Sequence, residues 1–220
     1  NVLMFNNEIY GLTKGQYSPT SPEGQVTKST PMGSLDHPFN PLSLALGADA
    51  TYVARSMDRD PLHLRKTLKN AHEHKGTSFV EIYQNCNVFN DGAFGTFTDK
   101  ATKDATTLIM EHGQPLTFDK GTKGLKLDGF TPRVVSINEG TSLDDLWVHD
   151  ENDYWKAQLL SRMFEAPSEG MELPRPFGTF YQTERPCYED LMNEQVKEAT
   201  EAKGEGNLDD LLRGNTTWEA

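Results

Sequence analysis

The chain has 220 residues, of which 35% are hydrophobic and 25% are charged, and its formal net charge is −12. This acidic balance argues against a nucleic-acid partner, which would require clustered Lys and Arg side chains. A membrane partner is not expected either, because no stretch reaches the roughly 18 apolar residues that a membrane-spanning helix needs.

The first predicted element is a strand at residues 2–5, followed by a long loop. The strand is a continuous apolar run, the pattern of a strand covered on both faces. Because the chain starts inside this strand, we expect it to be a fragment that lacks its amino-terminal part. The loop extends from Asn6 to about Asn40 and is rich in Gly, Ser, Thr and Pro. A loop of this length within a compact domain is usually functional or disordered.

Two helices and two further strands come next. Asn40 and Asp60 are suitable N-caps, each is followed by a proline, and Gly47 and Gly76 are expected to end the two helices. Strands are predicted at 50–54 and 78–83. This alternation predicts an α/β domain, a parallel sheet with helices on both faces that is incomplete at its amino terminus.

From about residue 91 the pattern is less regular. We therefore expect residues 1–90 to be the carboxy-terminal part of an α/β domain, and residues 91–220 to be a carboxy-terminal extension. The elements predicted in this extension are a hairpin turning at 119–124, a helix at 153–164, a strand at 176–182, an acidic helix at 188–202 and a short helix near 208–212.

The loop directly after the first strand carries the residues that suggest a ligand site. Ligands of parallel α/β sheets bind beyond the carboxyl ends of the strands, which is where residues 6–16 lie. The glycines allow close approach of the backbone to a phosphorylated ligand. An Asn side-chain oxygen and a main-chain carbonyl two residues later could bind a hard cation such as Mg²⁺. On residue types alone, an ordinary polar turn explains this loop at least as well.

Residues 7–20 (NEIYGLTKGQYSPT) resemble the β subunit of the 2-oxoacid:ferredoxin oxidoreductases, especially the 2-oxoglutarate type. They also resemble the second half of the thiamine pyrophosphate signature, in which a Gly-Asp-Gly element precedes paired asparagines. The resemblance continues through residues 30–33, 36–41 and 81–90, and more weakly at 185–188 and Trp218. The Gly-Asp-Gly element and an amino-terminal Cys-x-x-Cys are absent from this sequence. A truncated start would explain their absence, whereas a complete chain would put cofactor binding in doubt.

The resemblance implies roles for individual residues of the loop. In the family, the asparagine that matches Asn7 and the carbonyl that matches Ile9 complete the shell of an Mg²⁺ ion that bridges the cofactor's pyrophosphate. Lys14 matches a lysine near the substrate end of the site and is expected to contact the substrate carboxylate. The cofactor loop implied in this way consists of Asn6, Asn7, Ile9, Tyr10, Gly11, Leu12 and Thr13.

Cys86 and Cys187 are far apart in the sequence and neither forms a Cys-x-x-Cys pair, so a reducing, cytoplasmic compartment is expected. A single cysteine after a buried strand usually packs as a small hydrophobic residue. The resemblance nevertheless implies that Cys86 is the last of four ligands of a [4Fe–4S] cluster, with the other three upstream. Cys187 is expected to be structural, and His72 and His74 to be solvated.

The function implied by the resemblance is the oxidative decarboxylation of a 2-oxoacid, with 2-oxoglutarate as the expected substrate. Coenzyme A takes the acyl group, CO₂ leaves, and the electrons pass through the cluster to ferredoxin. An α subunit of the same enzyme is the expected partner, so this chain alone should be inactive. Two alternatives are a subunit of a non-redox thiamine pyrophosphate decarboxylase and a non-catalytic remnant that serves only in assembly.

Overall fold

The computed structural model describes residues 1–137, 141–164, 173–215 and 218. The chain divides into two compact units, Asn1–Glu184 and Arg185–Ala220. The first unit contains both sheets, and the described part of the second contains two helices.

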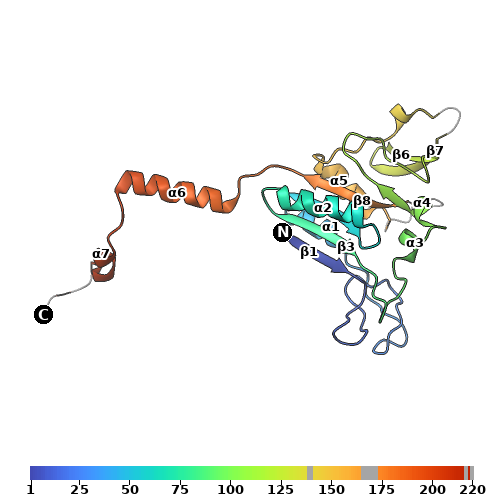
Figure 1. Ribbon diagram of the computed structural model, residues 1–220, viewed down its shortest axis with the longest axis horizontal. Coiled ribbons are helices and arrows are strands. Elements are labelled where there is room, and N and C mark those ends of the chain that lie inside the picture. Colours follow the sequence, from blue (N-terminus) through green and yellow to red (C-terminus); the bar gives the residue numbers. More distant parts are fainter. Residues whose placement is uncertain (138–140, 165–172, 216–217, 219–220) are drawn as a thin grey trace. The chain divides into compact units, whose positions relative to one another are not determined.

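A five-stranded sheet forms the centre of the first unit (Figure 1). Its strand order is β1 (Val2–Asn6), β3 (Ser78–Tyr83), β2 (Tyr52–Met57), β8 (Arg175–Gln182) and β4 (Thr107–Ile109). Strands β1, β3 and β2 are parallel, β8 is antiparallel to β2, and β4 is parallel to β8. The predicted α/β class is confirmed, with a sheet that mixes parallel and antiparallel pairs.

Helices cover both faces of this sheet. On one face, α1 (Pro41–Gly47) and α5 (Tyr154–Arg162) pack over a core that includes Leu42, Val53 and Phe180. On the opposite face, α2 (Pro61–Glu73) packs over Tyr52, Ala54, Val80 and Ile82. Because side chains of a strand alternate between faces, neighbouring residues of β2 belong to different cores.

The predicted caps are present at both helices in the first third of the chain. The Asn40 side chain accepts a hydrogen bond from Ser43 N, and the Asp60 side chain accepts one from His63 N. Each bond satisfies a backbone N–H of the first helical turn that has no partner within the helix. The predicted strand at 78–83 is confirmed, whereas the strand predicted at 50–54 lies later, at Tyr52–Met57.

The prediction that the first strand is covered on both faces is wrong for the described residues. Strand β1 is at the edge of the sheet, and Val2, Leu3 and Phe5 are 50%, 44% and 59% exposed. The helices α1 and α2 pack over β2 and β3 rather than over β1. An apolar run indicates a strand, but it does not distinguish a central position from an edge.

A three-stranded antiparallel sheet follows in the chain. It consists of β5 (Thr117–Phe118), β6 (Lys123–Asp128) and β7 (Thr131–Ser136), and the pairing of Thr117 with Gly124 confirms the predicted hairpin. The short helices α3 (Gly95–Thr98) and α4 (Lys103–Thr106) and a 3₁₀ turn at Leu143–Asp145 complete the unit. The division proposed at residue 90 stays a prediction; β8, from the later part, pairs with β2 from the earlier one.

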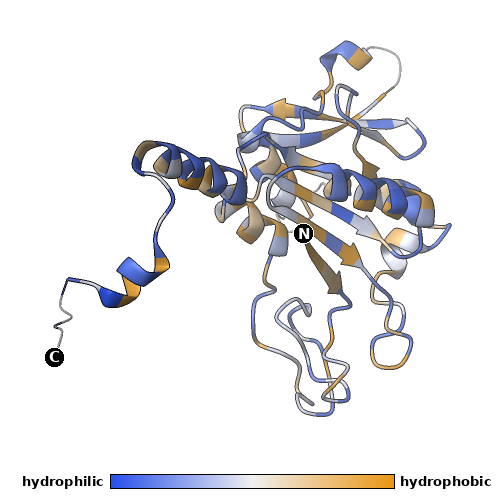
Figure 2. Ribbon diagram, turned by 60° about the vertical axis from the view of Figure 1, so that its left-hand side comes forward, coloured by the Kyte–Doolittle hydropathy of each residue, from blue (hydrophilic) through white to orange (hydrophobic). Residues whose placement is uncertain are grey.

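The second unit contains α6 (Tyr188–Lys203) and α7 (Leu208–Arg213), which confirms both helices predicted there. No described residue of these two helices is buried. In Figure 2, α6 alternates between hydrophilic and hydrophobic colours along its length. Across the described residues, the helices are all too short or too polar to cross a membrane.

Candidate functional site

The loops that follow β1 and β3 meet beyond the carboxyl ends of these two strands (Figure 1). The two strands are parallel and end side by side, with Asn6 paired to Tyr83. Beyond this pair, Gln84 N donates to Asn6 O (2.9 Å), and Asn90 Nδ2 donates to Asn7 O (2.9 Å). The structure therefore brings together the two segments that the sequence analysis selected, the loop after residue 5 and the segment around Cys86.

Two consecutive side-chain turns shape the start of the first loop. Asn6 Oδ1 accepts from Glu8 N (3.1 Å), and Asn7 Oδ1 accepts from Ile9 N (3.2 Å). Asparagine favours such turns because its side chain can bond to the backbone two residues later. Glu8, between Asn7 and Ile9, has a left-handed backbone conformation with φ of +54°. Paired asparagines thus fold the chain back on itself directly after β1.

A second tight turn follows at residues 10–16. Tyr10 N donates to Gln16 O (2.8 Å), and Gly15 N donates to Tyr10 O (3.0 Å). Gly15 has φ of +95°, and a Cβ atom there would lie 3.2 Å from the Phe89 ring. A glycine is therefore needed both for the conformation and for close approach of the two loops. Leu12 is at the tip of this turn and is 98% exposed.

An open groove of about 940 Å³ lies between these loops. Of the predicted site residues, Ile9 and Lys14 line it, together with Glu8, the stretch from Pro22 to Lys28, and residues 88–90. Tyr10 instead lines a neighbouring hollow of about 560 Å³. Asn6, which is 5% exposed, lies beneath the loop rather than in the groove. The predicted loop residues therefore share one loop but do not all face one space.

A buried ion pair supports the loop from below, and the sequence analysis missed it. Arg55 Nε lies 2.7 Å from Glu81 Oε2, and the two side chains are 2% and 1% exposed. Asn6 Nδ2 donates to the other oxygen of Glu81 (2.8 Å), and Thr20 Oγ1 donates to Asn6 Oδ1 (2.7 Å). Charged residues are almost never fully buried unless they are paired. An Arg and a Glu inside two otherwise apolar strands were the available signal.

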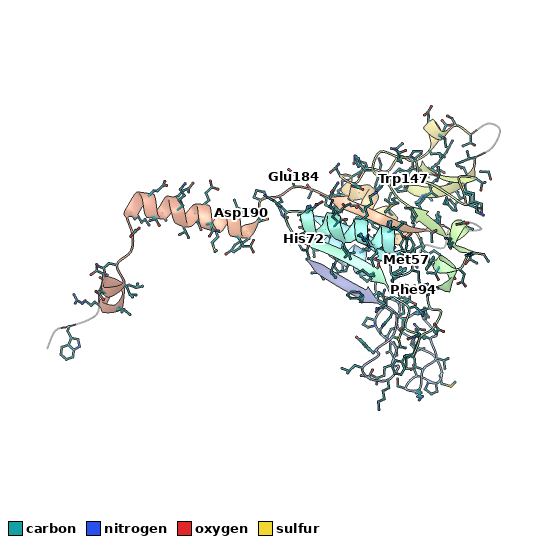
Figure 3. The ribbon with its side chains drawn as sticks, in the orientation of Figure 1. Met57, His72, Phe94, Trp147, Glu184 and Asp190 are labelled. Carbon is teal, nitrogen blue, oxygen red and sulfur yellow. The ribbon has the colours of Figure 1, made fainter. Side chains whose placement is uncertain are left out.

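Burial also raises the pKa values of two side chains at this end of the sheet. Burial raises the pKa of Glu8 to about 7, with Arg175 acting against the shift and Glu81 adding to it. Burial likewise raises the pKa of Tyr83 to about 12. The Tyr83 ring stacks on the Phe94 ring, with 4.2 Å between the centroids. Both belong to an apolar cluster that includes Met57, which lies near Phe94 in Figure 3.

Two oxygen atoms in the first loop are suitable ligands for a hard cation. Asn7 Oδ1 and the Ile9 carbonyl are oxygen donors two residues apart in one turn, and Mg²⁺ is bound by oxygen ligands. The Asn7 oxygen that accepts from Ile9 N keeps a second lone pair for a metal. These two residues therefore fit the role that the resemblance implied.

Cys86 is half-buried in the second loop and its thiol is free. Its carbonyl accepts from Asn90 N (2.9 Å). Among the described residues, no group of three or more His, Cys, Asp or Glu side chains could hold a metal ion. Any cluster bound by Cys86 would therefore need further ligands from beyond the described part of the chain.

Two histidines near the carboxyl end of α2 were predicted to be solvated, and only one of them is. His72 is exposed, as expected. His74 instead contacts Thr51 Oγ1 through Nε2 (2.8 Å), and burial lowers its pKa. His74 is thus a structural contact between the end of α2 and the start of β2, because Thr51 directly precedes that strand.

Comparison with known proteins shows which families this chain is similar to. Residues 1–82 match the family described as "Thiamine pyrophosphate enzyme, C-terminal TPP binding domain". The 2-oxoglutarate oxidoreductase subunit KorB of Mycobacterium tuberculosis is 43% identical over 222 residues, which cover 99% of this chain and 58% of that protein. The 2-oxoacid:ferredoxin oxidoreductase subunit beta of Saccharolobus solfataricus is 40% identical over 99 residues, covering 45% of this chain and 32% of that protein.

A solved structure gives a similar result. The 2-oxoglutarate:ferredoxin oxidoreductase of Magnetococcus marinus, with 2-oxoglutarate, coenzyme A and succinyl-CoA bound, aligns with a TM-score of 0.61 at 26% sequence identity. The alignment covers 96% of this chain and 55% of that chain. This chain therefore spans little more than half the length of the M. tuberculosis and M. marinus relatives.

Proposed function

The chain belongs to the β-subunit family of the 2-oxoacid:ferredoxin oxidoreductases, and on that premise we propose that it is the thiamine pyrophosphate-binding β subunit of such an enzyme. The proposed reaction is the oxidative decarboxylation of a 2-oxoacid, specifically 2-oxoglutarate, to acyl-CoA and CO₂, with electrons passed to ferredoxin. The observation that carries this proposal is the Asn7–Ile9 turn. It follows the carboxyl end of β1 and lies inside the segment that matches the cofactor-binding domain.

The proposed task of the first loop is to hold the cofactor. Asn7 Oδ1 and the Ile9 carbonyl would hold Mg²⁺. Residues 10–13 would complete the cofactor loop, and Asn6 would support it from beneath. When bound, thiamine pyrophosphate supplies the carbon nucleophile and the electron sink for decarboxylation. The contribution of this chain is to bind and orient it at the end of a rigid sheet.

Substrate and redox roles are proposed for two more residues. Lys14 lines the groove beside Ile9, where its ammonium group can pair with the distal carboxylate of 2-oxoglutarate. Cys86, on the adjoining loop, is proposed as one ligand of a [4Fe–4S] cluster that passes electrons to ferredoxin. An α subunit is the proposed partner for the rest of the active site, and coenzyme A is the proposed acyl acceptor.

Titration of the full-length protein, assembled with its partner subunit, tests the proposal. We expect the wild type to bind thiamine pyrophosphate in an Mg²⁺-dependent way, and Asn7→Ala to weaken that binding about tenfold or more, because one metal ligand is lost. Asn87→Ala is the matched control, an exposed asparagine on the adjoining loop. A wild type that binds no cofactor would refute the proposed function, and unchanged affinity of Asn7→Ala would remove Asn7 from the metal site.

A further inference from the structure

The central residue of the proposed metal loop has a strained conformation that its neighbours hold in place. Glu8 lies between Asn7 and Ile9 and has φ of +54°, a region that residues other than glycine rarely adopt. Its N–H donates to Asn6 Oδ1 (3.1 Å), and its carbonyl accepts from Ser21 Oγ. Strained backbone of this kind persists only where the surrounding structure fixes it. Both backbone polar groups of Glu8 are fixed here.

The orientation of the Asn6 amide decides whether this arrangement can form. Its oxygen must face the loop, where it accepts from Glu8 N and from Thr20 Oγ1 (2.7 Å). Its NH₂ group points the other way and donates to Glu81 Oε1 (2.8 Å). An ionised carboxylate only accepts hydrogen bonds, so Glu81 admits only the NH₂ end of Asn6. The carboxylate thereby selects one of the two amide orientations.

Glu81 is itself fixed within the sheet. Its second oxygen lies 2.7 Å from Arg55 Nε, and Arg55 Nη1 donates to the carbonyl of Pro176 (3.3 Å). These contacts join β3, β2 and β8, three adjacent strands of the sheet. Because Arg55 and Glu81 are each 1% exposed, water cannot replace these bonds. The polarity of the Asn6 amide is therefore determined in the core of the sheet.

We propose that Glu81 is a positioning residue for the cofactor loop, which acts through the Asn6 amide to hold Glu8 in the conformation that presents Asn7 and Ile9 to the metal. This inference rests on the proposed function, because it assigns a purpose to the same loop. Glu81 does not reach the groove, so its effect is on the geometry of the metal ligands and not on the reacting atoms.

The replacement Glu81→Gln tests the orientation directly. The substituted side chain has one oxygen, which Arg55 takes, so its NH₂ group faces Asn6 and forces the Asn6 amide to turn over. The turned amide then presents NH₂ to the Glu8 N–H, and the bond that holds Glu8 is lost. We expect Mg²⁺-dependent binding of thiamine pyrophosphate to weaken about tenfold or more, which corresponds to the loss of one buried hydrogen bond. Asn6→Asp places a second carboxylate against that of Glu81 and should weaken binding as well.

The double variant Asn6→Asp/Glu81→Gln should restore binding to within about threefold of the wild type, since the interacting pair is changed on both sides. The introduced amide donates to one oxygen of the introduced carboxylate, and the other carboxylate oxygen again accepts from Glu8 N and Thr20. A purely structural role for Glu81 predicts no such rescue. Glu151→Gln is the matched control, because Glu151 accepts a similar bond from Gln182 (2.7 Å) at the opposite end of β2 and should leave binding unchanged.

Hydrogen exchange of the Glu8 amide gives a readout that needs no cofactor. The full-length, partner-bound protein should protect this amide in the wild type and the double variant, and expose it in Glu81→Gln. Wild-type affinity and protection in a folded Glu81→Gln variant would overturn the inference. If Glu81→Gln does not fold, a folded double variant that binds tenfold more weakly and lacks protection would overturn it equally. A wild type that protects Glu8 but binds no cofactor would instead refute the proposed function alone.

Discussion

Replacing Arg55 with methionine should be one of the most destabilising single changes in the first unit. The Arg55 guanidinium lies 2.7 Å from Glu81, and both side chains are almost fully buried. Methionine keeps apolar contact with the rings of Tyr83 and Phe180, over which the guanidinium lies at 5.2 and 5.4 Å. What remains is a buried carboxylate without its counter-charge, and losing one partner of a buried pair costs about 3–5 kcal/mol.

Chemical and thermal unfolding of Arg55→Met measures this cost. For a unit of this size, each kcal/mol lowers Tm by about 2–4 °C, so we expect a fall of about 6–20 °C. The control is Lys69→Met, because the exposed pair of Lys69 and Glu73 in α2 should contribute less than about 1 kcal/mol. The double variant Arg55→Met/Glu81→Leu should be more stable than Arg55→Met, since it removes the uncompensated charge. A single variant within about 1 kcal/mol of the wild type would refute this reasoning.

Three further predictions concern single side chains. Lys14→Ala in the assembled enzyme should raise KM for 2-oxoglutarate about tenfold or more, the equivalent of one charge-assisted bond, while KM for pyruvate changes little. Equal losses on both substrates would indicate a general role. Cys86→Ser should keep cofactor binding and lose iron and ferredoxin reduction, because a [4Fe–4S] cluster normally needs four thiolates; a full cluster with an unchanged paramagnetic resonance spectrum would exclude Cys86 as a ligand. Burial lowers the pKa of His149, whose Nε2 lies 2.8 Å from Thr179 O. The unfolded chain therefore binds a proton more readily, and stability should fall as the pH drops below about 6.5. Urea unfolding at pH 5 and pH 8 should show a smaller acid loss in His149→Gln, and an identical loss would assign the effect to other groups.

Local sequence signals determined several of the regular elements of this protein. The caps at Asn40 and Asp60, each followed by proline, define the starts of α1 and α2, because the orphan N–H groups of a first helical turn depend on residues within three positions. The hairpin between Thr117 and Gly124 was likewise predictable from its turn. The proposed site residues Asn7 and Ile9 were predicted from a contiguous string that resembles one family, and contiguous strings need no tertiary structure to be recognised.

Only the tertiary structure decided which strands are neighbours and what lies beneath the loop. The sequence does not show that β8 is antiparallel to β2, or that β1 lies at an edge, because an apolar run is the same in either place. Arg55, Glu81 and Asn6 come from three strands and are separated by up to 75 residues. Their polar contacts exist only once parallel pairing aligns β1, β3 and β2. The role proposed for them in the loop depends on that alignment, since a hydrogen bond between distant residues depends on the packing of the whole sheet.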